Sequence, residues 1–307
     1  MNLSTHRRTF LRRSFGFAAA AAAVSVPPRA AFAEGKVARE AGSRIKLGLN
    51  AYSFDKPLRG GQMTLAEAVH YCAQQGLDAI DATGYYFPGY PKVPSDESIY
   101  AFKRTAFLNG IGISGTGVRN DFTLPDAAAR KAEVQLVKDW IEAAAKLGAP
   151  VIRAFSGKSV PDGYTFDQVL AWMVPDFKEC AAYGKLHGVI VGVQNHNDFL
   201  KTAAETIRLI DAVDSEWCGS ILDVGSLRTN DPYEEIEKLA PYAVSWQLKE
   251  NVGYGTKETP TDLKKVKAII DKVGYRGFLP IEALGSGDHR ISVAKFLEQV
   301  RPVFGRT

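Results

Sequence analysis

The chain has 307 residues, of which 46% are hydrophobic and 23% are charged, and this balance excludes a disordered or fibrous protein. Residues 1–33 contain five arginines and no acidic residue, so the 38 basic and 34 acidic residues of the whole chain become 33 and 34 in residues 34–307, a net charge of −1. A nearly neutral body argues against a protein that binds nucleic acid through clustered Lys and Arg side chains.

The first 33 residues have the pattern of an export signal. Two adjacent arginines, Arg7 and Arg8, precede an apolar stretch of 12 residues over 15–26 and a small-residue cleavage pattern at 31–33. This order resembles a twin-arginine leader cleaved near Ala33, which predicts an exported or periplasmic protein. An ordinary secretory leader and an uncleaved membrane anchor are the alternatives. No later stretch reaches 18 uninterrupted apolar residues, so we expect no stable membrane insertion after cleavage.

Residues 34–44 are small and polar, and we interpret them as a linker. From residue 45 to residue 304, short apolar runs alternate with segments whose apolar residues recur at helical spacing. The predicted strands cover 45–50, 79–82, 111–114, 151–154, 189–194, 220–223, 243–247 and 278–282. The predicted helices cover 64–75, 126–146, 166–187, 202–213, 232–239 and 261–273.

Eight strands that alternate with helices in about 260 residues have the size of a single (β/α)8 TIM barrel, which we predict for residues 45–304. The main alternative is a doubly wound open sheet. Such a sheet normally has a glycine-rich phosphate loop after its first strand. Residues 50–54 contain no glycine, which favours the barrel.

Polar side chains stand at the carboxyl ends of the last four predicted strands, where TIM barrels place their chemistry. They are Gln194, Asp223, Gln247 and Glu282. Consecutive strands bring such side chains round one rim, and their oxygens are ligands that Mg²⁺ or Mn²⁺ prefers. Each residue alone has a simpler interpretation as a loop residue or a helix cap. Together they predict a site for one divalent metal ion.

At this point the chain resembles the sugar phosphate isomerase/epimerase family, the xylose isomerase-like TIM barrels. The resemblance lies in residues 47–54, 76–81, 153, 194–196, 222–225, 247–249 and 281–282. It implies one divalent metal held by Glu, Asp, His and Glu at the ends of strands five to eight. Carried over position by position, these ligands fall on Gln194, Asp223, Gln247 and Glu282.

The departures from the family pattern restrict the chemistry. Gln194 replaces a Glu, Gln247 replaces a His, and Ser226 stands where a His commonly follows. The family works with two carboxylate bases on opposite faces of the substrate, and a glutamine cannot accept a proton. Only Glu282 of that pair remains, which disfavours epimerisation by two bases.

The remaining groups suit proton abstraction next to the carbonyl of a sugar or keto-sugar, as in an isomerase or a lyase. The metal ion is expected to polarise the carbonyl, and either Glu282 or a metal-bound hydroxide is the expected base. Lys249, His196 and Glu250 are candidates for a second group that delivers a proton, although a structural ion pair for Lys249 and a loop position for His196 are the simpler interpretations.

Aromatic and polar residues after the first four strands are candidate substrate contacts. The rings of Tyr52, Tyr85 and Tyr86 suit stacking on a sugar, Arg153 suits a hydroxyl or carboxylate, and Asn120 adds a polar contact. A hydrophobic loop that only stiffens the rim is the alternative for the tyrosines. The segment 251–260 is long enough to act as a lid.

Two other classes remain open at this point. An abasic-site endonuclease shares the barrel but needs several metal-binding histidines, and residues 34–307 contain four histidines, two of them in predicted helices. A sugar-binding barrel without catalysis is compatible with the two glutamine replacements. The sequence leaves the sugar, its phosphorylation and the oligomeric state open.

Overall fold

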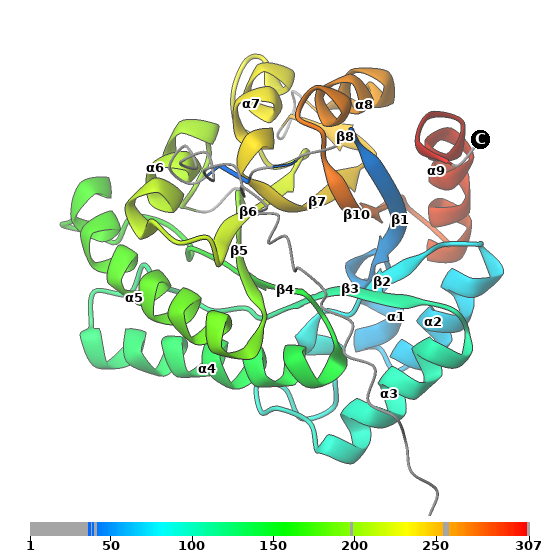
Figure 1. Ribbon diagram of the computed structural model, residues 1–307, viewed down its shortest axis with the longest axis horizontal. Helices are drawn as coiled ribbons and strands as arrows, with labels where there is room; N and C mark the ends of the chain where they lie inside the picture. Colours follow the sequence, from blue (N-terminus) through cyan, green and yellow to red (C-terminus); the bar gives the residue numbers. More distant parts are fainter. Residues whose placement is uncertain (1–35, 38, 40–41, 197–198, 254–257, 306–307) are drawn as a thin grey trace, which may run out of the picture. The chain divides into compact units, whose positions relative to one another are not determined.

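The computed structural model describes residues 36–37, 39, 42–196, 199–253 and 258–305 (Figure 1). The predicted export signal lies outside these residues, and so do parts of the predicted linker and of segment 251–260. Within the described part of the chain, every helix is too short or too polar to cross a membrane.

Eight parallel strands close into a barrel. Strand β1 lies between β2 and β10, so that Leu49 pairs with Ile80 on one side and with Ile281 on the other. Each strand is found within three residues of its predicted bounds, which confirms the (β/α)8 barrel and excludes the doubly wound sheet. The strands are β1 (Arg44–Asn50), β2 (Ala79–Asp81), β3 (Gly112–Gly117), β4 (Val151–Ala154), β5 (Ile190–Gln194), β6 (Cys218–Asp223), β7 (Ala243–Lys249) and β10 (Arg276–Glu282).

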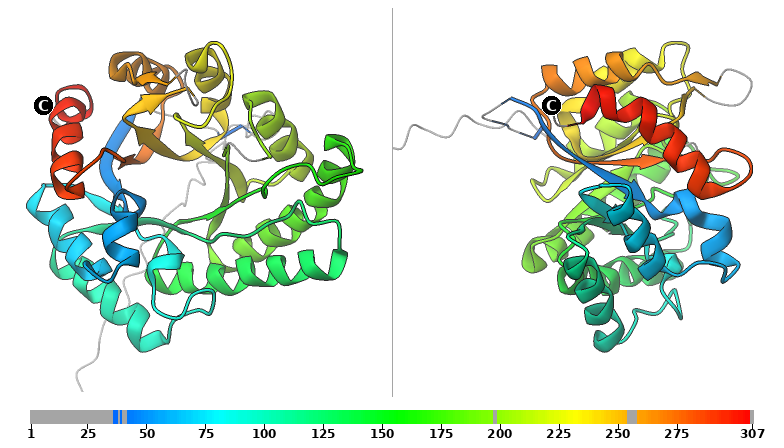
Figure 2. Two further views of the ribbon diagram at one scale, coloured as in Figure 1. Left: turned by 180° about the vertical axis from the view of Figure 1, so that it is seen from behind. Right: turned by 90° about the vertical axis from the view of Figure 1, so that its right-hand side faces the viewer.

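Helices surround the barrel on the outside (Figure 2). The sequence analysis predicts α2 and α4 to α8 and does not find α1, α3 and α9. In α3 only three residues are buried, while Phe107 and Leu108 at its end are exposed, so its apolar residues do not mark one face. The helices are α1 (Asp55–Arg59), α2 (Leu65–Gln74), α3 (Asp96–Leu108), α4 (Ala127–Leu147), α5 (Phe166–His187), α6 (Ala203–Val213), α7 (Pro232–Leu239), α8 (Leu263–Lys272) and α9 (His289–Phe304).

Local signals explain where several helices begin and end. Helices α2, α5 and α6 each begin with a threonine cap whose hydroxyl accepts from the third backbone N–H, and a Glu or Gln there accepts from the threonine N–H in return. Such capping boxes satisfy backbone donors that have no partner inside the helix. Helix α4 ends at Gly148 in the left-handed conformation, with φ of 78°, as expected for a glycine at this position.

The core fills the barrel and the space between the barrel and its helices. Trp140 of α4 is fully buried and donates its Nε1–H to the carbonyl of Pro91 at 2.8 Å. Phe122 and Phe177 pack edge to face with ring centroids 5.0 Å apart. Burial of large apolar side chains at this density supplies most of the stabilisation of such a barrel.

A short antiparallel pair, β8 (Asn251–Val252) and β9 (Thr259–Pro260), lies in the segment predicted as a lid. Thr261 follows β9 and contacts the backbone at the end of β7. Its Oγ1–H donates to the carbonyl of Lys249 at 2.7 Å, and its N–H donates to the carbonyl of Glu250 at 2.8 Å. These bonds fix the backbone at the carboxyl end of β7.

Candidate active site

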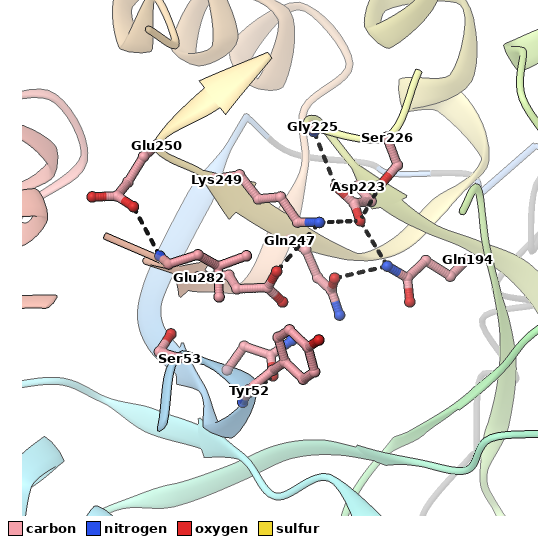
Figure 3. Close-up of polar contacts among 12 residues, drawn as sticks. Tyr52, Ser53, Gln194, Asp223, Gly225, Ser226, Gln247, Lys249, Glu250 and Glu282 are labelled. Carbon is pink, nitrogen blue, oxygen red and sulfur yellow. Dashed lines mark hydrogen bonds and ion pairs between the residues drawn. The ribbon is translucent and has the colours of Figure 1, made fainter. Parts of the chain in front are cut away.

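The four residues predicted at the carboxyl ends of the last strands lie together (Figure 3). Gln194 ends β5, Asp223 ends β6, Gln247 lies in β7 beside Asp223, and Glu282 ends β10. Their exposed fractions are at most 4%. The sequence pattern therefore placed these side chains in one cluster.

The centre of this cluster is the ammonium group of Lys249. Lys249 pairs with Glu282 in the register of β7 and β10. Its Nζ lies 2.8 Å from Asp223 Oδ2 and 3.2 Å from Glu282 Oε1. One partly buried cation therefore bridges the two buried carboxylates, an arrangement in which attraction compensates for the loss of hydration.

Gln194 joins the cluster as a hydrogen-bond donor. Its Nε2 donates to Asp223 Oδ2 at 2.7 Å and to Gln247 Oε1 at 2.9 Å. Its Oε1 is buried and has no hydrogen-bond partner among the described residues. The nitrogen of this amide, and not its oxygen, thus faces Asp223.

Further contacts fix Asp223. Ser226 Oγ–H donates to Asp223 Oδ2 at 2.7 Å, and the Gly225 N–H donates to Oδ1 at 2.9 Å. Asn195 holds its backbone, because the Asn195 Nδ2 donates to the Asp223 carbonyl at 2.9 Å and the Asp223 N–H donates to Asn195 Oδ1 at 2.8 Å. Sequence reasoning missed Asn195, although its position directly after a strand is the same signal that marked the others.

The charges set the protonation of the cluster. Burial raises the pKa of Asp223, but Lys249 and the hydrogen bonds outweigh burial and hold that pKa below its usual value. Burial lowers the pKa of Lys249, but Asp223 and Glu282 outweigh it and raise that pKa. Lys249 is therefore an ammonium ion and not an amine nucleophile. Burial raises the pKa of Glu282, and Lys249 opposes this shift only in part.

Asp81 and Arg153 form a second charged group at the rim, and both are buried. Arg153 Nη2 donates to the Tyr85 hydroxyl at 3.2 Å. Burial raises the pKa of Asp81 to about 6, while Arg153 acts to lower it. Sequence reasoning did not select Asp81, although it ends β2. A shift of register between Ile80 and Asp81 sets Asp81 opposite Gly115, where a Cβ would lie 3.0 Å from its Oδ2.

The predicted aromatic contacts lie on the same rim. Tyr85 packs edge to face on Tyr86, with ring centroids 4.8 Å apart. The guanidinium group of Arg59 lies over both rings, and that of Arg119 lies over the Tyr85 ring. Tyr86 donates to Asp55 Oδ1 at 2.6 Å. A cavity of about 390 Å³ borders Tyr85 and both arginines.

Tyr52 and Asn120 have different surroundings. Burial raises the pKa of Tyr52, and the negative charges of Asp55 and Glu282 add to this shift, which places its ring near the base (Figure 3). Asn120 is buried, its Nδ2 donates to the Phe155 carbonyl at 2.7 Å, and its Oδ1 accepts from the Phe155 N–H at 2.9 Å. These bonds give Asn120 a structural task, and its contact with substrate stays a prediction.

Two cavities meet at His196. One of about 320 Å³ borders Lys249, Glu250 and Glu282, and another of about 480 Å³ borders Asn120, and His196 lines both. The His196 ring packs edge to face on Phe155 at 5.0 Å. The carboxylate of Glu250 accepts from the Leu284 N–H at 2.8 Å. Glu282, Lys249 and His196 thus face one space of the size that small ligands occupy.

The side chains do not fit a divalent ion in the arrangement observed. The Lys249 ammonium stands between the two carboxylates that would bind the ion, and Gln194 directs a nitrogen at Asp223. Among the described residues, no three His, Cys, Asp or Glu side chains are grouped to hold a metal. Binding of Mg²⁺ or Mn²⁺ by Gln194, Asp223, Gln247 and Glu282 stays a prediction, and it requires Lys249 to leave this position.

Solved structures share the fold at low sequence identity. The chain is similar to a D-psicose 3-epimerase from Clostridium cellulolyticum H10 solved with D-tagatose, with TM-score 0.71 and 18% identity over 85% of this chain and 100% of that one. It is similar to the 3-keto-D-glucoside 4-epimerase YcjR from E. coli, with TM-score 0.68 and 13% identity over 84% and 100%. It is also similar to the IOLI protein with a bound zinc atom, with TM-score 0.70 and 15% identity over 85% and 100%.

Curated proteins provide no match to this sequence. The model of one family, described as xylose isomerase-like TIM barrel, matches residues 69–299. This match covers most of the chain and includes β2 to β10. The chain therefore belongs to the xylose isomerase-like TIM barrel family.

Proposed function

We propose that this protein is an enzyme that removes a proton next to the carbonyl of a sugar or keto-sugar, and that it acts as an isomerase or a lyase. One observation carries the proposal: the buried carboxylate of Glu282 borders a cavity of about 320 Å³ beside a partly buried cation, Lys249. The epimerases with a similar fold are named for D-psicose and a 3-keto-D-glucoside, which supports a sugar substrate.

The proposed reaction begins with transfer of the α-proton from substrate carbon to a Glu282 oxygen. The electron pair of the C–H bond forms a C=C bond, and the carbonyl oxygen takes up the negative charge. The protonated Glu282 then returns the proton to the former carbonyl carbon, while the hydroxyl proton of the α-carbon passes to the former carbonyl oxygen, which gives an isomer with the carbonyl moved by one carbon. If the β-carbon carries a leaving group, its bond breaks instead and an unsaturated product forms.

His196 is the better placed of the two other candidates for a second proton carrier. Its ring borders both cavities, and an imidazole exchanges protons near neutral pH. Glu250 has one oxygen bound to the Leu284 N–H, which gives its carboxylate a task in holding the backbone after β10. We therefore prefer His196 to Glu250 as the group that delivers a proton to the leaving oxygen.

Deuterium exchange tests the proposed base. The full chain is incubated in D₂O with D-fructose, D-tagatose and a 3-keto-glucoside, and exchange of the α-proton is followed by NMR. One α-proton should exchange with a single stereochemistry, and Glu282→Gln should lose about 10²–10⁴-fold in rate, the usual effect of removing a general base.

Glu97→Gln is the matched control, because Glu97 is an exposed glutamate in the first turn of α3. This variant should keep its exchange rate within a small factor. Full exchange activity in Glu282→Gln would refute the mechanism, and sugar binding without any exchange would favour a sugar-binding barrel. Exchange on both faces of the substrate would show that another residue replaces the second carboxylate.

A further inference from the structure

Lys249 occupies the centre of the carboxylate cluster, the position at which the family resemblance implies a metal ion. Its Nζ lies within 3.2 Å of both Asp223 and Glu282. Lys249 is two residues after Gln247 in β7, so both side chains point to the same side of the strand. The ammonium group therefore reaches the cluster from strand β7 of the barrel itself.

We propose that Lys249 is a built-in cation that takes the place of the divalent metal ion in this barrel, and that its ammonium group stabilises the oxyanion formed on the substrate.

Charge supports this assignment. The ligand set implied by the resemblance has three carboxylates, which together with a divalent ion carry a net charge of −1. Here Gln194 replaces one carboxylate, and Asp223, Glu282 and the ammonium also carry a net charge of −1. The loss of one negative charge and the exchange of a divalent cation for a monovalent one therefore compensate each other.

The hydrogen-bond directions support it as well. Asp223 Oδ2 accepts from Lys249, Gln194 and Ser226. Three donors converge on this one oxygen, and they occupy the lone pairs that a metal ion would need. Gln247 accepts from Gln194 through the oxygen that would otherwise face the ion.

The backbone leaves room for this lysine. A Cβ atom at Gly225 would lie 2.6 Å from Lys249 Cδ and 2.9 Å from the Asn251 carbonyl, so the absence of a side chain at Gly225 lets the lysine stem pass. Thr261 fixes the Lys249 carbonyl from the other side. The backbone of Lys249 is thus fixed at the end of β7, and the two carboxylates hold its ammonium group.

The ammonium also reaches the substrate space. Lys249 has a side-chain exposure of 19% and lines the cavity of about 320 Å³. An ammonium has three N–H donors, of which Asp223 and Glu282 receive two. The third can donate to a substrate oxygen beside the base, where a charged donor stabilises a developing oxyanion. This catalytic part rests on the proposed function, whereas the replacement of the metal does not.

Metal content of the wild-type protein is the first test. The full chain, purified without an affinity tag, is analysed by mass spectrometry for Mn, Mg, Zn and Fe, and its Tm is measured with EDTA and with added Mn²⁺ or Zn²⁺. We expect metal far below one equivalent and no change of Tm in either direction. Stoichiometric metal whose removal lowers the Tm would overturn the proposal.

Two substitutions test whether Lys249 is the reason that the cluster binds no metal ion. Lys249→Met removes the charge and keeps the length of the side chain, and Gln194→Glu restores the third carboxylate. The double variant should bind Mn²⁺ or Zn²⁺ and gain about 5–10 °C in Tm at a metal concentration on the order of 100 times Kd. Gln194→Glu alone, with Lys249 present, should gain much less.

Lys185→Met is the matched control, because Lys185 forms an exposed ion pair with Glu216 at 3.8 Å, and it should show no metal response. The absence of a metal response in the double variant would overturn the proposal. If the double variant does not fold, the wild-type measurement decides. These readouts do not depend on turnover, so a failure of the proposed function, seen as full exchange in Glu282→Gln, is distinguishable from a failure of this inference.

Discussion

Asp81 is a buried carboxyl group whose ionised form the fold disfavours. Its Oδ1 has no hydrogen-bond partner among the described residues. Burial raises its pKa to about 6, Arg153 acts against this shift, and Glu282 adds to it. The native state therefore holds the proton of Asp81 more tightly than the unfolded chain does.

This shift predicts a dependence of stability on pH. The pKa of Asp81 in the folded state lies above its value of about 4 in the unfolded chain. The contribution of Asp81 to the free energy of unfolding is therefore fully present below pH 4 and is lost as the pH rises through about 6. Asp81→Asn removes the ionisable group and with it this loss of stability at high pH. The free energy of unfolding of the variant, relative to that of the wild type, should therefore rise by about 1–1.5 kcal/mol from pH 5 to pH 8. Urea unfolding at both pH values measures this difference.

Asp162→Asn is the control for this measurement, because Asp162 is exposed and its substitution should change stability equally at both pH values. An equal effect of Asp81→Asn at pH 5 and pH 8 would contradict the assignment of a raised pKa to Asp81.

At the same scale, the sequence identified most of the cluster but not its bonding. Gln194, Asp223, Gln247 and Glu282 were predictable because each is polar and ends a strand. The bridge from Lys249 to Asp223 and Glu282 depends on the register of β7 against β6 and β10, which the sequence does not contain. The period of two in a strand, which puts Lys249 on the side of Gln247, was the available signal.

At the scale of elements, two asparagines play the same part in two successive pairs of strands, β3 with β4 and β5 with β6. Asn120 follows β3 and pairs with the backbone of Phe155 after β4. Asn195 follows β5 and pairs with the backbone of Asp223 at the end of β6. Each amide continues the strand pairing by one step beyond the barrel, and the second one also fixes an active-site carboxylate.

This repeated contact predicts two variants with equal stability and unequal activity. Asn120→Ala and Asn195→Ala each leave a buried backbone N–H and carbonyl without a partner, which should cost about 1–3 kcal/mol of unfolding free energy. Only Asn195→Ala should slow proton exchange, because it frees Asp223 and through it Lys249. Urea unfolding and the exchange assay measure the two effects, and equal exchange rates in both variants would contradict a positioning role for Asn195.

Elements were predictable where they bury one clear face. Helix α5 was predicted with its observed bounds, because a capping box starts it and a glycine ends it. Strands β8 and β9 have two residues each, too few for a period to be visible. Helix α1 has five residues and no buried one, so its sequence carries no apolar pattern.

At the scale of the whole molecule, the barrel itself was predictable from the alternation of eight strands with helices. The count of eight fits a TIM barrel, and the lack of a glycine-rich loop after the first strand favoured the closure of β1 on β10 over an open sheet. The export signal, in contrast, lies outside the described residues, and its function stays a prediction. The proposed replacement of the metal ion by Lys249 bears on the predicted export. A barrel that supplies its own cation does not need to take up a metal ion in the cytoplasm before export.

Export through the twin-arginine route is testable in the living cell. Arg7→Lys with Arg8→Lys keeps the positive charge and removes the arginine pair that this route reads, so the precursor should accumulate in the cytoplasm. Cell fractionation and mass spectrometry of the N-terminus report location and cleavage near Ala33. Arg12→Lys with Arg13→Lys is the control and should be exported normally. Normal export of the first variant would assign the leader to the general secretory route, which carries unfolded chains, and the barrel would then fold after export.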